Sequence, residues 1–477
     1  MDSRIITIHR DLSSGKRSCF DLMQEKLTSL SANTYHTANL LFTESALEQA
    51  KQVDGKIKSG QPIGLLEGVP FGIQDIILLQ NSITTGGTAF LKNYNAPYTA
   101  SAIQKLIDAG AIPVVKENCD CFGICNTGGS AVNVARGFTT FSIGGDTGGA
   151  IRQSAGYNQI YSLKPTYGRI SRYGMMANMS STDCIGPLAS SLEDIRILIN
   201  TMSGKDVKDP TTFSSSVLPP NVFDAGYLKN EIIVGFYKNF VDNEYLDDSI
   251  KNNFQKMLDI ISAKGVKIKP LDFFDVNRMV SVFYVLAMAE EASNLARLDG
   301  SLYGDRAKSS ARDGYMITRT DNFSKEMISR IVGGNMAISR ENYEDIYLKA
   351  RGLRNMIADR FDTCFKEVDV ILSPIACRDV ACNVSSLPLA STHGVHNTST
   401  IPPDGAHPIS TLPPADCSNP YDSLSIYLSD GFTVGFSLGG LPTMAVPFFT
   451  PTGIQITSNK NQEDVILNFA RFLKEFQ

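Results

Sequence analysis

The chain has 477 residues, of which 43% are hydrophobic and 19% charged, with a formal net charge of −5. This length and composition allow a sizeable buried core, and no apolar run reaches the length that spans a bilayer. The slight acidic excess gives no electrostatic footprint for direct nucleic-acid binding, which usually shows as a clustered basic face. The composition therefore predicts a globular protein that contacts neither nucleic acid nor a membrane by itself.

The N-terminal run MDSRIITIHRDLSSGKRSC has neither the apolar core of a signal peptide nor the composition of a transit peptide. The nine cysteines are scattered without the spacing of a disulfide framework, which is typical of reduced thiols. We therefore expect a cytoplasmic protein. Cys119, Cys121 and Cys125 lie close together, but without a nearby histidine or a fourth cysteine they predict no zinc site.

Helix and strand patterns alternate along the chain. Residues 101–110 have apolar side chains at helical spacing and end on a glycine, and 111–117 read as a buried strand. The same order recurs in 250–265 and 266–271, and two further short apolar runs are 231–237 and 368–374. The alternation predicts an α/β fold with a mixed twisted sheet flanked by helices on both sides. The polar stretch 203–227 is predicted to be a surface loop.

The most informative motif is the glycine-rich turn GGDTGGAIRQ at residues 144–153. Its four glycines let consecutive backbone N–H groups converge on one point, which suits an anion or a carbonyl oxygen that gains negative charge. Such a turn can present a nucleophile, but Ala150 stands at that place and has no heteroatom. A loop packed tightly against a helix can carry the same glycines, so the motif by itself does not decide between the two interpretations.

The sequence around this turn resembles the amidase signature family. The likeness runs through LKPTYGRISRYG and SSTDCIGPLASSLED, and it extends to residues 64–94, 98–118, 294–306, 347–357, 368–376 and 427–447. Within the family, the chain is most similar to the A subunits of glutamyl-tRNA(Gln) amidotransferases. The resemblance implies a single amidase-like domain over residues 1–477, no cofactor, and partner subunits of the B and C types.

The resemblance also implies where the family's catalytic groups would stand. The family uses a lysine base, a bridging serine and a serine nucleophile, and the matching positions here hold Gln74, Asn126 and Ala150. Glutamine and asparagine do not exchange a proton at useful pH, and alanine offers no nucleophile. The segment before Asn126 is also shorter than the family pattern. We therefore expect that amide hydrolysis by the family mechanism is absent.

A displaced nucleophile is the alternative for an active enzyme. Cys125 adjoins Asn126 and is the first candidate, because a thiol is partly ionised near neutral pH. Ser130, Ser142 and Ser154 also lie close to the motif, although serines in turns usually bond to the backbone.

A ligand clamp is the second implication of the resemblance. Arg354 matches the residue that binds the α-carboxylate of glutamine, and Asp430 matches the residue that holds the α-amino group. The backbone N–H groups of Thr147, Gly148, Gly149 and Ala150 would hold a carbonyl oxygen. The alternatives stay open: Arg354 on a solvated helix face, and Asp430 as a helix cap.

Residues 377–421 are rich in Pro, Ser and Thr and are predicted to be an inserted surface loop. The stretch collects three histidines and three cysteines whose spacing matches no standard metal site: His393, His396, His407, Cys377, Cys382 and Cys417. Near the C-terminus, only IQITSNK remains of a longer strand that the family has after FFTPTG. We expect the edge of the sheet to be trimmed there.

Three classes of function follow from the sequence. The first is a catalytically inactive amidase-like protein that binds a glutamine-like or amide ligand, or amidotransferase partner subunits. The second is an active enzyme, either the glutamine-hydrolysing component of an amidotransferase or a small-amide hydrolase. The third is a structural assembly component that binds no ligand.

Overall fold

The computed structural model describes residues 2–123, 129–219, 232–377, 396–397, 429–448 and 452–476. A twelve-stranded mixed sheet runs through it in the order β10-β1-β3-β2-β4-β6-β5-β11-β12-β9-β7-β8. Pairs β2–β3, β2–β4, β7–β8 and β7–β9 are parallel, and β4–β6, β5–β6 and β11–β12 are antiparallel. The strands are β1 Ala38–Leu41, β2 Pro70–Gln74, β3 Ile112–Glu117, β4 Phe141–Asp146, β5 Tyr161–Lys164, β6 Cys184–Ala189, β7 Ile233–Tyr237, β8 Lys267–Leu271, β9 Val370–Pro374, β10 His396–Asn397, β11 Thr443–Val446 and β12 Ile454–Ser458.

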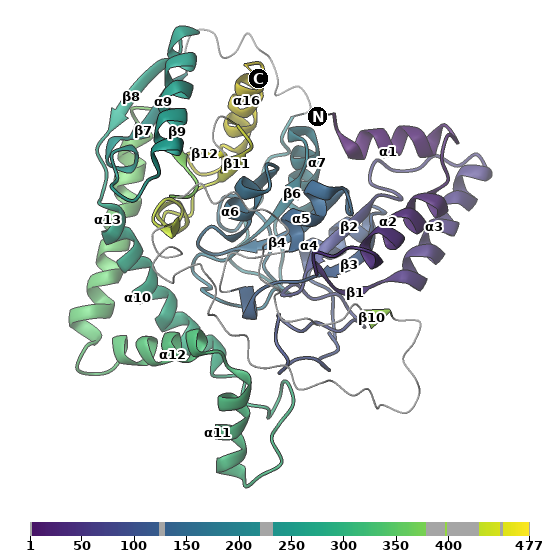
Figure 1. Cartoon of the computed structure of the whole chain (residues 1–477), viewed down its shortest axis with the longest axis horizontal. Coiled ribbons are helices and arrows are strands. Elements are labelled where there is room, and N and C mark those ends of the chain that lie inside the picture. The colour runs from purple at the N-terminus through teal and green to yellow at the C-terminus, as the bar shows by residue number, and fades with distance from the viewer. Residues whose placement is uncertain are drawn as a thin grey trace.

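Helices cover both faces of this sheet, as predicted (Figure 1). Neighbouring residues of one strand enter different hydrophobic clusters: Met444 belongs to the cluster that includes residues of α7 and α16, and Ala445 to the cluster that includes residues of α5 and α6. The helices are α1 Arg4–Ser13, α2 Cys19–Ser31, α3 Thr43–Lys58, α4 Ser101–Asp108, α5 Gly129–Arg136, α6 Ala150–Tyr157, α7 Leu192–Met202, α8 Lys238–Val241, α9 Asp248–Ala263, α10 Val276–Leu295, α11 Ala311–Asn322, α12 Lys325–Ala337, α13 Lys349–Cys364, α15 Val434–Leu438 and α16 Glu463–Lys474, with a 3₁₀ turn at Cys121–Gly123 and a π-helical turn at Tyr343–Leu348.

The local sequence patterns explain the βα units. The apolar residues of α4 lie at helical spacing and are buried, and the helix gives way to Gly110 with φ of 90°, a conformation that favours glycine. The buried strand β3 follows at once. The predicted helix and strand of the second unit are α9 and β8, and the two isolated apolar runs are β7 and β9. These predictions are confirmed.

One prediction about the sheet is wrong. The run IQITSNK does not trim an edge, because β12 lies inside the sheet and pairs antiparallel with β11 on one side and β9 on the other. Every residue of β12 is buried. The strand is short, but it lies inside the sheet. The shorter sequence after FFTPTG therefore does not remove residues from an edge strand. Most of the predicted loop 377–421 lies outside the described residues, and β10 is the part of it that the structure places.

Candidate ligand site at the Ala150 loop

The glycine-rich turn joins β4 to α6, and Ala150 is the first residue of the helix. Gly149 has φ of 143°, and a Cβ atom there would come within 2.4 Å of the Thr433 hydroxyl. A Cβ atom on Gly148 would meet the ring of Phe283 at 2.8 Å. The glycines are therefore needed where α10 and the segment before α15 close over the turn.

A buried ion pair holds the two ends of the turn together. Arg152, in the first turn of α6, donates from Nε and Nη2 to the two carboxylate oxygens of Asp146, each at 3.0 Å. Its remaining contacts are the carbonyl of Thr433 and the side chains of Gln455 and Ser437. Neither charged side chain is exposed. The bidentate pair fixes the start of α6 relative to the end of β4.

The backbone N–H groups of the turn are available. Within the described residues, no acceptor takes the N–H groups of Gly148, Gly149 and Ala150, as expected for the first turn of a helix. Thr147 instead fixes the turn through its side chain, which donates to Asp183 at 2.7 Å. Burial raises the pKa of Asp183, and the hydrogen bonds that it accepts oppose the rise. We call the four N–H groups of residues 147–150 the amide cradle.

Gln74 ends β2 beside this turn. The backbone ladder between β2 and β4 stops at the pair Ile73–Ile143, and the Gln74 side chain continues it, because its Oε1 accepts from the N–H of Gly145 at 2.7 Å. Gln74 is 7% exposed, and within the described residues its Nε2 group has no acceptor. The structure therefore brings Gln74 to the cradle as a neutral amide tied to the backbone.

Asp430 precedes α15 and is buried at 6% exposure. Its Oδ1 accepts from Gln153 Nε2 at 3.0 Å, and its Oδ2 accepts from the hydroxyl of Tyr284 at 2.6 Å. Gln153 lies one turn after Ala150 on α6, so Asp430 is joined to the same helix as the cradle. Through these two bonds the side chain links α6 to α10.

Arg354, on α13, is half-buried and turned toward Ser181. Its Nη1 and Nη2 donate to the hydroxyl and carbonyl of Ser181 at 2.7 and 2.8 Å, and its Nε donates to the carbonyl of Leu438. Ser181 in turn donates to Glu290 through its N–H and its hydroxyl. Arg354 thus uses three of its five N–H groups, and the other two have no acceptor in the part of the chain that is described.

Helix α10 connects these groups, and sequence reasoning missed it. Phe283 packs on Gly148, Tyr284 bonds to Asp430, and Glu290 holds Ser181 beside Arg354. Gln153 is the last residue of the glycine-rich motif, three residues after Ala150, so its helical spacing gives a signal that can be read from the sequence. No spacing rule in the sequence marks the residues of α10, because their partners lie far away along the chain.

The candidates for a displaced nucleophile divide into two groups. The first candidate, Cys125, lies outside the described residues, as does Asn126 beside it. Ser142 is buried and donates to Glu117 at 2.6 Å, and Ser154 is buried and donates to a helix carbonyl. Ser130 is 5% exposed, and its side chain lies close enough to Glu117 to lower the pKa of that carboxyl. Asn133 also donates to Glu117, whose pKa burial raises to about 7.

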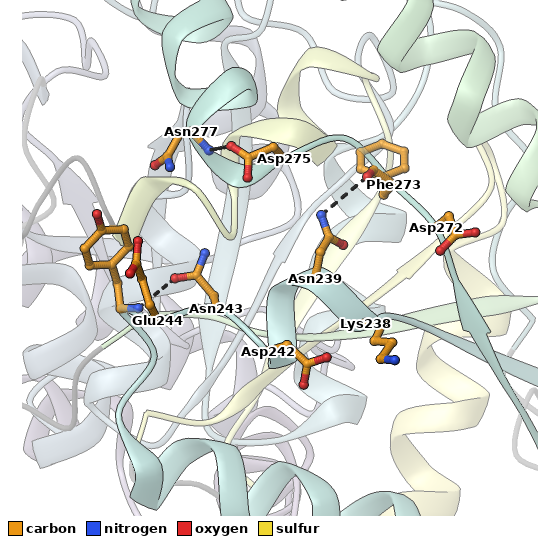
Figure 2. A pocket seen from close by; sticks show the side chains of 10 residues that line it. Lys238, Asn239, Asp242, Asn243, Glu244, Asp272, Phe273, Asp275 and Asn277 are labelled. Atoms are coloured by element: carbon orange, nitrogen blue, oxygen red, sulfur yellow. Dashed lines mark hydrogen bonds between the residues drawn. The ribbon is translucent and has the colours of Figure 1, made fainter.

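A pocket of about 490 Å³ lies elsewhere, beyond the carboxyl ends of β7 and β8 (Figure 2). Four of the ten residues that line it are acidic and one is a lysine. It therefore offers little to an anionic ligand, and none of the predicted site residues lines it. The ten are Lys238, Asn239, Asp242, Asn243, Glu244, Tyr245, Asp272, Phe273, Asp275 and Asn277.

Among the described residues, no group of three or more His, Cys, Asp or Glu side chains is arranged to hold a metal ion. The same search range contains no helix long and apolar enough to cross a bilayer. Cys377 is buried near Ser429, and the side chains of the other residues in its sequence cluster lie outside the described part.

Comparison with known proteins places this geometry in a family. A model of the Amidase family matches residues 23–127 and 125–383. The chain belongs to the amidase signature family. The A subunit of the glutamyl-tRNA(Gln) amidotransferase of Trichodesmium erythraeum is 33% identical over 98% of this chain and 96% of its own length. The corresponding protein of Nostoc punctiforme is 32% identical over 97% of this chain and 95% of its own length.

Solved structures confirm the amidase fold. The crystal structure of the A subunit from Thermotoga maritima matches with a TM-score of 0.65 and 25% identity, over 87% of this chain and 84% of that one. A 6-aminohexanoate cyclic dimer hydrolase matches with a TM-score of 0.74 over 99% of this chain and 96% of that one, and its 17% identity supports the fold alone. The predicted likeness to the A subunits is thereby confirmed.

Proposed function

We propose that this amidase-family chain is a protein that no longer hydrolyses amides and instead binds a small glutamine-like ligand, together with B- and C-type amidotransferase subunits. The observation that carries the proposal is the pair Gln74 and Ala150 at the cradle. Gln74 is bonded through its oxygen to Gly145, and Ala150 has no heteroatom. A nucleophile and a base within hydrogen-bond reach are what covalent amide hydrolysis requires.

The binding half of the proposal rests on donors that stay available. The amide cradle, the Nε2 group of Gln74 and two N–H groups of Arg354 have no acceptor in the described residues. A side-chain carbonyl would take the cradle, and a carboxylate would take the guanidinium fork. Asp430 supplies the negative charge for an ammonium group, while it keeps its bonds to Tyr284 and Gln153.

A second candidate is a structural component of an assembly that binds no ligand. It is favoured by the internal bonds of the clamp: both oxygens of Asp430 already accept hydrogen bonds, and Arg354 already holds Ser181. A ligand has to share these bonds rather than fill empty positions.

Calorimetric titration of the full chain with glutamine, asparagine and glutamate separates the two candidates. The binding proposal expects heat with glutamine or asparagine and a rise in the unfolding temperature, since a ligand of the native state alone stabilises it. Absence of heat for all three contradicts ligand binding and favours the structural component. An assay of ammonia release in the presence of B- and C-type subunits tests the loss of hydrolysis separately.

A further inference from the structure

The end of the candidate ligand site at the glycine-rich turn presents hydrogen-bond donors. The backbone N–H groups of Gly148, Gly149 and Ala150 have no acceptor within the described residues. They lie at the start of α6, where N–H groups lack a partner inside the helix and the helix dipole favours negative charge. Every helix has such an end, so these groups select a ligand only together with a second donor.

The side-chain amide of Gln74 is that second donor. A backbone N–H can only donate, so the atom of Gln74 that faces the N–H of Gly145 at 2.7 Å is the oxygen Oε1. Nε2 is therefore the end of the carboxamide that stays free. The side chain is 7% exposed, and Nε2 has no acceptor among the described residues. A buried donor without an acceptor is costly, so a ligand that accepts from it gains affinity.

Gln74 and the amide cradle meet over Gly144. A Cβ atom built on this glycine would lie 3.1 Å from Oε1 of Gln74 and 2.9 Å from Cγ2 of Ile151, the residue that follows Ala150 on α6. The carboxamide at the end of β2 therefore lies against the first turn of α6. Its Nε2 group and the N–H groups of the cradle are donors at the same end of the site.

The carboxylates around the turn already have donors of their own. Both oxygens of Asp146 accept from Arg152. Asp183 accepts from the hydroxyl of Thr147 and from two backbone N–H groups. An NH₂ group of a ligand has to compete with these bonds for an acceptor. The charge of Asp183 opposes an anion, so a preference for a carboxylate rests here on hydrogen bonds rather than on net charge.

We propose, on the basis of the proposed function, that this end of the site selects a carboxylate over a carboxamide, so that the ligand is an acidic amino acid and glutamate binds in preference to glutamine. Both oxygens of a side-chain carboxylate accept, one from the cradle and the other from Nε2 of Gln74. A carboxamide of the same size has one oxygen, and its NH₂ group then faces a donor, which disfavours it.

Calorimetric titration of the full chain with glutamate and with glutamine, at one pH and ionic strength, measures this preference. The two ligands share their α-amino and α-carboxyl groups, so the ratio of their dissociation constants reports on the side-chain end. We expect glutamate to bind about tenfold more tightly, because one buried donor stays unpaired with glutamine. Glutamine should still give heat at higher concentration.

Substitution of Gln74 tests whether this residue sets the ratio. Gln74→Glu replaces the free donor with an acceptor and keeps an oxygen for the N–H of Gly145, so glutamine should bind at least as tightly as glutamate. Gln61→Glu is the matched control, because Gln61 is exposed after α3 and the same change of charge there should leave the native ratio. Gln74→Met removes the donor without adding a charge and should bring the two dissociation constants to within about threefold.

Thermal unfolding of each variant shows whether it is folded, and Gln74→Met decides the question if the buried glutamate disturbs the fold. Glutamine that binds the native chain as tightly as glutamate would overturn the preference and leave the proposed function standing. A preference for glutamate that neither Gln74 substitution changes would also overturn it, since Gln74 would then lie outside the ligand site. Heat from neither ligand would contradict the proposed binding function, and the preference with it.

Discussion

The Ala150 loop and helix α12 differ in the surroundings of their side chains. Around the loop, charges are buried in pairs and side chains bond to neighbouring elements, as Arg152 does with Asp146 and Asp430 with Tyr284. On α12, apolar side chains face outward and the flanking charges have no partner in the described structure. The difference is that the chain itself holds the loop in place, whereas α12 leaves apolar side chains open to solvent.

The largest expected effect comes from unpairing the loop. Asp146→Ala leaves Arg152 buried without its carboxylate, which should lower the free energy of unfolding by about 3–5 kcal/mol. Urea titration followed by circular dichroism measures the loss. The control is Asp345→Ala, which removes the exposed pair between the π-helical turn and Lys349 of α13 and should cause no measurable change.

Equal stability of the Asp146→Ala variant and the native chain would show that water or a shifted side chain reaches Arg152. The conclusion that this buried ion pair holds the loop in place would then be wrong.

A second effect concerns the buried carboxyl of Glu117, on β3 beside the loop. Burial raises its pKa from 4.5 to about 7, so the folded chain holds this proton more tightly than the unfolded chain does. Stability from this group is complete below pH about 4.5 and is lost as the pH rises through about 7, by about 3 kcal/mol in total. Glu117→Gln should remove that loss, because an amide keeps the bonds from Asn133 and Ser142 without a charge.

The measurement is the free energy of unfolding of both chains at several pH values from acid to slightly alkaline. We expect the two curves to separate as the pH rises, with the variant more stable above neutrality. If the free energies of unfolding of the two chains changed with pH in the same way, the ionised carboxylate of Glu117 would be stabilised where it is buried.

The smallest of these effects is on the proposed ligand. Arg354→Ala removes the guanidinium fork and should weaken binding of a glutamine-like ligand by about 1.5–3 kcal/mol, the range for hydrogen bonds to a charged group. Arg351→Ala is the matched control, because Arg351 lies three residues away on α13 and is exposed. Equal affinities of the two variants in calorimetry would exclude Arg354 from the ligand site.

The sequence predicted the βα units because their signals are local. The apolar spacing of α4 and the glycine after it lie within a few residues of each other, and so do the patterns of α9 and β8. The position of β12 was predicted wrongly, because its pairing with β11 and β9 depends on residues far away in the chain. The sequence of a short strand does not show whether it lies at the edge or inside a sheet.

The same limit applies to the site. The motif placed Gln74 and Ala150 together, and the structure has both at the turn between β4 and α6. Tyr284 and Glu290 were not predicted, since a tyrosine and a glutamate on a long helix carry no local signal for their partners Asp430 and Ser181. The assignment of roles to these residues stays a prediction.

The most direct test of the proposed function is ammonia release from glutamine by the purified full chain, alone and with B- and C-type subunits, with the relative from Trichodesmium erythraeum in its own complex as the positive control. We predict release at the background level in every mixture that contains this chain, because Gln74 and Ala150 provide neither a base nor a nucleophile. Release above background that disappears in a Cys125→Ala variant would contradict the account and identify an enzyme with a displaced nucleophile.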